Sequence, residues 1–141
     1  MALIREADLL APISGYTRRQ GYTRQSAEVQ FYDYRIDLYG FSKPTGRTVA
    51  IELKLHKWQR AIEQALVYQL CADFVFIAMP VPSIARVNLQ EVSHHGIGLI
   101  SVGSSRCKLE VAARQSVEVR EHYKRYYVEL LKGCSAWQTR I

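Results

Sequence analysis

Two carboxylates and a lysine lie close together in the first half of this chain of 141 residues. Asp37 is followed fifteen residues later by the tripeptide Glu52-Leu53-Lys54. Carboxylate oxygens are ligands that Mg²⁺ prefers, and a nearby ammonium group stabilises negative charge that develops during a reaction. These residue types suit metal-assisted hydrolysis of a phosphodiester, in which the phosphate must be neutralised and a water activated near neutral pH.

Alternating hydrophobicity predicts that both parts of this set lie on β-strands. Apolar and polar residues alternate in residues 34–41 and again in residues 49–55, where Glu52 and Lys54 share one face. The link between the two strands is rich in turn residues and predicts a hairpin. Asp37 would then lie beside Glu52 and Lys54 on one sheet face. The alternative is that Glu52 and Lys54 face water on a half-exposed strand.

The chain after this tripeptide has the pattern of a helix followed by a buried strand. Apolar residues at three-and-four spacing predict an amphipathic helix over residues 57–71. Gln64 and Tyr68 are four residues apart, so they share a helix face that can look toward the preceding strand. The apolar run 74–79 predicts a buried strand, so the segment forms a βαβ unit with parallel strands.

From about residue 28 to residue 80, the sequence resembles the PD-(D/E)XK nuclease superfamily, which includes restriction endonucleases, Holliday-junction resolvases and transposon-end nucleases. The resemblance rests on Asp37, on Glu52-Leu53-Lys54 after an apolar run, and on a following helix with Gln64 and Tyr68. It implies a restriction endonuclease-like αβα sandwich with a mixed central β-sheet. Ile36 stands where a proline often precedes the aspartate, a substitution that the superfamily tolerates.

The resemblance also implies a role for each residue. Asp37 and Glu52 would be metal ligands, with the backbone carbonyl of Leu53 as a third. Lys54 would orient the attacking water or stabilise the developing charge, and Gln64 would position the substrate backbone or the water. The implied cofactor is Mg²⁺, for which Mn²⁺ would substitute.

The resemblance calls for one more acidic residue, and two candidates fit. Glu6 lies in the expected first helix, and Glu28 lies in residues 27–31. We favour Glu28, because residues 27–31 have the pattern of a strand next to the one that carries Asp37. The alternative is that Glu28 is an ordinary surface charge.

Basic and aromatic residues near the N-terminus form a candidate nucleic-acid surface. A short helix is expected over residues 2–10, followed by a loop in which Gly-Tyr-Thr-Arg occurs at residues 15–18 and again at 21–24. Arginines interleaved with tyrosines suit phosphate contact and base stacking, although a polar turn with a chance echo is the alternative. The residues predicted to bind nucleic acid are Arg18, Arg19, Arg24, Arg35 and Tyr68.

Composition bounds the class of protein. A chain of 141 residues that is 48% hydrophobic predicts one domain over residues 1–141, with a core at about 28–102 and a C-terminal helix at about 118–132. A net charge of +6 favours an anionic partner. DNA is the expected partner, and RNA remains an alternative because the metal chemistry is shared. A homodimer would let two sites cut both strands of a duplex.

The remaining pattern predicts elements and a compartment. Residues 83–95 are expected to form an irregular helix, residues 96–102 a strand and residues 108–112 an edge strand. No apolar run approaches the ~18 residues of a membrane-spanning helix, and charges near the N-terminus argue against a signal peptide. The cysteines are odd in number and form no zinc pattern, which is typical of reduced thiols in the cytoplasm. They are Cys71, Cys107 and Cys134.

The leading hypothesis is therefore a metal-dependent nuclease that hydrolyses phosphodiester bonds of DNA endonucleolytically. The sequence contains no Walker phosphate loop, G-x-S-x-G motif or H-E-x-x-H motif. The alternative is a catalytically inactive nuclease-fold module that binds nucleic acid or a protein partner.

Overall fold

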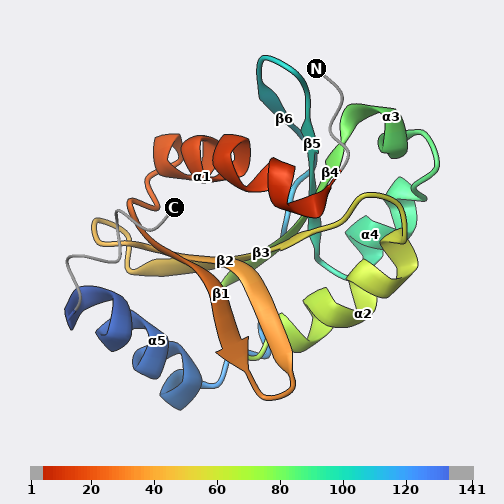
Figure 1. Ribbon diagram of the computed structural model, residues 1–141. Coiled ribbons are helices and arrows are strands. Elements are labelled where there is room, and N and C mark those ends of the chain that lie inside the picture. The colour runs from red at the N-terminus through yellow and green to blue at the C-terminus, as the bar shows by residue number, and fades with distance from the viewer. Residues whose placement is uncertain (1–4, 134–141) are drawn as a thin grey trace.

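The computed structural model describes residues 5–133, which form a β-sheet with helices on both faces (Figure 1). The strands are β1 (Arg24–Phe31), β2 (Tyr34–Ser42), β3 (Arg47–Leu53), β4 (Phe74–Pro80), β5 (Gly98–Val102) and β6 (Cys107–Val111). The helices are the 3-10 helix η1 (Glu6–Leu9), α1 (Leu10–Arg19), α2 (Trp58–Tyr68), α3 (Val81–Ile84), α4 (Leu89–His94) and α5 (Glu121–Gly133).

The six strands lie in the sheet in the order of the sequence. β1, β2 and β3 pair antiparallel, β3, β4 and β5 pair parallel, and β6 pairs antiparallel with β5. The crossover from β3 to β4 runs through α2, as the βαβ pattern predicts. The predicted α/β class with a mixed sheet is therefore confirmed.

Each face of the sheet buries its own apolar residues. On one face, Ile51 and Leu53 of β3 pack with Leu9 of η1 and Ile13 of α1. Figure 1 shows η1 and α1 on this side of the sheet, with α2 and α5 on the other. The alternation predicted for β3 therefore holds, and it sends Glu52 to the opposite face.

The second face packs against α2 and α5. Tyr39 of β2 and Ile77 of β4 are fully buried there with Ala65 of α2. Tyr127 of α5 lies over Tyr39, with ring centroids 5.1 Å apart. This face carries the candidate site at the end where β3 leads into α2.

The N-terminal helix differs from the sequence prediction. Helix was expected only to residue 10, but α1 continues through Pro12 to Arg19, so the first Gly-Tyr-Thr-Arg copy is helical rather than a loop. Pro12 is the third residue of α1, where an amide has no intrahelical acceptor, so the proline removes no helix hydrogen bond. Residues 2–4 of the predicted helix lie outside the described residues.

The predicted irregular helix over residues 83–95 is two short helices, α3 and α4. The break spans residues 85–88. At its end, the Asn88 side chain accepts a hydrogen bond from the Glu91 amide at 3.1 Å and so caps α4. In residues 5–133 no helix is long and apolar enough to cross a membrane. Cys71 and Cys107 are free thiols, and Cys134 lies outside the described residues.

Candidate active site

The two carboxylates meet where β2 and β3 separate. Leu38 pairs with Ile51 in the antiparallel register, so Asp37 comes next to Glu52 one step further along. Past this pair of residues, the Asp37 side chain replaces a backbone carbonyl of β2 as the hydrogen-bond acceptor for β3. Its Oδ2 accepts a hydrogen bond from the Leu53 amide at 2.7 Å. The hairpin thereby fixes Asp37 against the backbone of the Glu-Leu-Lys tripeptide.

α2 supplies two side chains that hold the charged residues of β3. The Tyr68 hydroxyl donates to Oε1 of Glu52 at 2.9 Å. Lys54 Nζ lies 3.4 Å from Oε2 of Glu52 and donates to Oε1 of Gln64 at 3.0 Å. The one-turn spacing of Gln64 and Tyr68 thus places both against the same strand, and the structure brings all four side chains together.

Burial makes this cluster electrostatically unusual. Glu52 is only 3% exposed. Burial, reinforced by the negative charge of Asp37, raises the pKa of Glu52 to about 7, against the lowering effect of Tyr68 and Lys54. Burial also raises the pKa of Asp37, opposed by the hydrogen bond from Leu53. Two crowded carboxyl groups with raised pKa values attract a proton or a cation.

Glu6 is the third acidic residue that the structure brings to this cluster. Its negative charge contributes to the raised pKa of Asp37. Its Oε2 also accepts a hydrogen bond from the Leu55 amide at 3.4 Å, just beyond Lys54. η1 therefore delivers a carboxylate to the end of β3.

Glu28, which the sequence favoured, is placed differently. Its side chain is exposed and forms an ion pair with Arg35 at 3.2 Å. Glu28 has a φ of 53° and lies between the paired positions Ala27 and Val29, so it forms an irregularity in β1. A strand pattern read from sequence cannot reveal such an irregularity, nor can it show where η1 docks.

The two carboxylates of Asp37 and Glu52 fit a magnesium ion, although two ligands are few for a metal site. Within residues 5–133, no group of three or more His, Cys, Asp and Glu side chains is arranged to hold a metal. Mg²⁺, however, is commonly bound by one or two carboxylates, with waters and substrate phosphates completing its coordination. Asp37 and Glu52 offer such a pair. A cation there would offset the burial that raises both pKa values, and also the negative charge of Asp37 that adds to the effect at Glu52.

The arginines predicted to bind nucleic acid lie in different places. Arg18 donates to the Thr23 carbonyl at 3.1 Å, and Arg24 contacts the Lys132 carbonyl at 3.4 Å. Arg24 pairs with Phe41, which faces the start of β3. Arg18 and Arg24 are therefore at the opposite end of the sheet from Glu52, roughly 15 Å away along the strand.

Arg19 and Arg35 differ from these two residues. Arg19 lines a cavity shared with Arg106 and Cys107, so its side chain reaches the β5–β6 turn. Arg35 pairs with Glu28, and its carbonyl oxygen lies 3.2 Å from the Tyr68 hydroxyl. Tyr68 is fully buried, so its hydroxyl holds Glu52 rather than forming part of an open surface.

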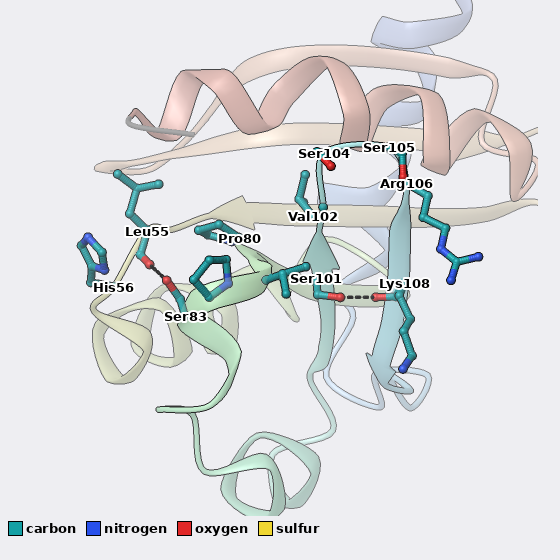
Figure 2. Close-up of a pocket in the computed structure, with 13 residues that line it drawn as sticks. Leu55, His56, Pro80, Ser83, Ser101, Val102, Ser104, Ser105, Arg106 and Lys108 are labelled. Atoms are coloured by element: carbon teal, nitrogen blue, oxygen red, sulfur yellow. Dashed lines mark hydrogen bonds between the residues drawn. The ribbon is translucent and has the colours of Figure 1, made fainter. Parts of the chain in front are cut away.

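A cavity of about 640 Å³ lies at the carboxyl ends of β3, β4 and β5, and its lining includes Leu55, the residue after Lys54. Figure 2 shows Leu55 and His56 on one side of it and Arg106 and Lys108 on the other. This cavity was not predicted from the sequence. The signal was available, because ligand sites in open α/β sheets form where parallel strands end.

Comparison with known proteins supports the architecture. The fold is similar to that of a protein of unknown function from Silicibacter pomeroyi, with a TM-score of 0.73 and 16% sequence identity. The match covers 94% of this chain and 87% of that one. At this identity the likeness shows the fold alone. No protein family and no curated protein matches the sequence.

Proposed function

We propose that this protein is a restriction endonuclease-like, metal-dependent nuclease that hydrolyses phosphodiester bonds of DNA within the strand. The observation that carries the proposal is the contact of Lys54 with both Glu52 and Gln64, beside Asp37, at the end of β3. A buried Glu52 beside a half-buried Asp37 and a fixed lysine is costly for stability, and metal-assisted phosphate hydrolysis uses each of these groups.

Asp37 and Glu52 would hold the Mg²⁺ ion. When bound, the ion would neutralise the phosphate and lower the pKa of a water molecule. Tyr68 orients the Glu52 carboxylate through its hydrogen bond, and the Leu53 amide orients that of Asp37. The chain therefore fixes one oxygen of each carboxylate before substrate binds, which reduces reorganisation during the reaction.

Lys54 is the positively charged group of the site. Gln64 and Glu52 hold its ammonium at 3.0 and 3.4 Å, so its position is set without the substrate. In hydrolysis a bond forms between the water oxygen and phosphorus, the bond to the leaving oxygen breaks, and that oxygen takes up a proton. A fixed ammonium stabilises the negative charge that spreads over the phosphate oxygens, an effect worth about 3 kcal/mol in comparable sites.

The direct test is cleavage of supercoiled plasmid and branched DNA, with Mg²⁺ or Mn²⁺, by wild type and Glu52→Ala. Glu63→Ala is the matched control, because Glu63 is an exposed acid on α2. We expect metal-dependent nicking by wild type and Glu63→Ala and none by Glu52→Ala. Equal nicking by all three proteins would contradict the proposal. Linear products from plasmid at low enzyme concentration would support a homodimer that cuts both strands.

The alternative is a binding module without turnover. It is favoured by the lack, within the described chain, of a group of three metal-binding side chains. On this alternative, wild type binds DNA and cleaves neither substrate with either metal. Cleavage of the branched substrate made as RNA distinguishes a ribonuclease from a deoxyribonuclease, because only the nucleic acid differs.

A further inference from the structure

The cavity at the ends of β3, β4 and β5, here called the strand-end pocket, is structurally tied to the candidate site. Leu55 lines the pocket and directly follows Lys54. Its amide donates to Glu6, and its carbonyl accepts a hydrogen bond from the Ser83 hydroxyl at 2.5 Å. One wall of the pocket is therefore held in place by the same segment that carries the tripeptide.

The opposite wall is positively charged. Arg106 ends the turn between β5 and β6 and Lys108 lies on β6, and both are exposed. This turn is closed by a hydrogen bond from the Gly103 amide to the Arg106 carbonyl at 2.9 Å. The nearby carboxylate of Glu110 is held by the hydroxyl of the lining residue Ser101 at 2.8 Å, and within residues 5–133 neither cation forms an ion pair. These two charges are thus available to an anionic ligand.

Size and apolar character narrow the class of ligand. A volume of about 640 Å³ lies within the usual range for small-molecule sites and exceeds what one phosphate needs. Pro80, Val81 and Val102 supply apolar surface between the Leu55 wall and the basic wall. A base with its sugar matches the apolar part, and a phosphate matches Arg106 and Lys108. A base that is paired and stacked in a duplex cannot enter such a pocket.

We propose that the strand-end pocket holds an unpaired nucleotide of the substrate strand, next to the phosphate that is cleaved. The proposal rests on the proposed function for the identity of the ligand, and it makes the preferred substrate a single-stranded or unpaired region. Arg106 and Lys108 contact phosphates, and Val81 packs against the base.

Binding without metal tests the pocket separately from catalysis. The affinity of a single-stranded 12-mer and of the same sequence as a duplex is measured in EDTA across salt concentrations. The test variant is Arg106→Ala/Lys108→Ala. Its control is Lys43→Ala/Arg120→Ala. Lys43 lies in the β2–β3 turn, and Arg120 immediately precedes α5, where its amide donates to the Leu70 carbonyl just after α2, so both lie at the other end of the sheet.

We expect the test variant to lose about tenfold in affinity for the single strand at low salt and its salt slope to fall by about 1.4, as for two lost phosphate contacts. The control should bind as wild type does. An unchanged affinity and slope in the test variant, an equal loss for single strand and duplex, or no binding by wild type would each overturn the proposal.

A second variant tests the apolar wall. Val81 is 51% exposed, so Val81→Asp places a charge at the pocket with little effect on the fold. Val117→Asp is the control, because Val117 is 93% exposed and lines a different cavity. We expect only Val81→Asp to weaken binding of the single strand, and equal affinities would contradict base contact. The expected binding results without cleavage by wild type would support the pocket and overturn the nuclease proposal. Cleavage by wild type that is lost in Glu52→Ala, with unchanged binding by the pocket variants, would support the nuclease and overturn the pocket.

Discussion

The Tyr68 hydroxyl lies 2.9 Å from Oε1 of Glu52 and 3.2 Å from the Arg35 carbonyl oxygen. A hydroxyl has one proton to donate, so the two acceptors compete for it. An ionised Glu52 attracts that proton more strongly than a backbone carbonyl does. Tyr68 therefore favours the charged form of Glu52, and it lowers the Glu52 pKa against the effect of burial.

Replacing this hydroxyl should shift the pH at which the site accepts a metal. In Tyr68→Phe the pKa of Glu52 should rise by about one unit, because a hydrogen bond to the charged form is lost. Thermal stabilisation by Mg²⁺, measured from pH 6 to pH 9, should then move to higher pH. Tyr34→Phe is the control. Tyr34 packs edge-on against the Tyr68 ring, whereas the hydrogen bond to Glu52 comes from Tyr68. The same shift in both variants would assign it to packing instead.

The raised pKa of Glu52 also makes stability depend on pH. The folded protein keeps a proton up to about pH 7 that the unfolded chain releases near 4.5. The contribution to stability is thus fully present below about pH 4.5 and is lost as the pH rises to about 7. The loss should be about 3 kcal/mol in urea unfolding of wild type.

Glu52→Gln should remove most of this decline in the free energy of unfolding, because an amide does not titrate. A smaller decline should remain from Asp37, whose pKa is raised in the same direction. Saturating Mg²⁺ should oppose the decline in wild type, since metal binding requires the deprotonated carboxylates. A stability that rises from pH 5 to pH 7 in wild type would contradict the assignment.

Lys54 should matter for turnover more than for affinity. Lys54→Ala is expected to reduce the cleavage rate about a thousandfold, the usual size of one electrostatic contact to the transition state, and to keep most of the DNA affinity. Lys57→Ala is the control, because Lys57 is an exposed lysine three residues away. Rates come from single-turnover cleavage and affinities from binding in Ca²⁺ or EDTA. Equal losses in rate and affinity would make Lys54 a binding residue.

The local parts of this site could be predicted from the sequence, because each depends on a short pattern. The period of two in β3 separates Glu52 from Leu53, and the period of α2 aligns Gln64 with Tyr68. The contribution of Glu6 depends on how η1 packs across the sheet, which no local pattern encodes. Likewise, the strand-end pocket is formed by segments from β3 to β6 that meet only in the folded chain.

The placement of Glu6 leads to a comparison between two acids. Glu6→Gln should lower the apparent affinity for Mg²⁺, measured as Mg²⁺-linked stabilisation, by about tenfold. This is the size expected for a group that acts on the metal ligands without binding the metal itself. Glu28→Gln should leave it unchanged, because Glu28 is exposed and pairs with Arg35. Thermal denaturation across Mg²⁺ concentrations gives both values. A larger loss of Mg²⁺-linked stabilisation in Glu28→Gln than in Glu6→Gln would instead favour Glu28 as the additional acid.

Asp73 is a buried acid outside the candidate site, and its contacts mark it as structural. Its Oδ2 accepts hydrogen bonds from the Thr48 amide at 2.9 Å and the Thr48 hydroxyl at 3.1 Å, and it pairs with Lys124 at 2.8 Å. The residue thus joins the starts of β3 and β4 to α5, at the far end of the sheet from Glu52.

Removing the charge of Asp73 should destabilise the fold without changing Mg²⁺ binding at Asp37 and Glu52. Asp73→Asn leaves Lys124 without its buried partner and should cost about 3 kcal/mol in urea unfolding. Asp33→Asn is the control, because Asp33 is exposed in the β1–β2 turn. Mg²⁺-linked stabilisation should stay the same in both variants, since neither acid lies near Glu52. A loss of metal-linked stabilisation in Asp73→Asn alone would instead place the cation at Asp73, at the opposite end of β3.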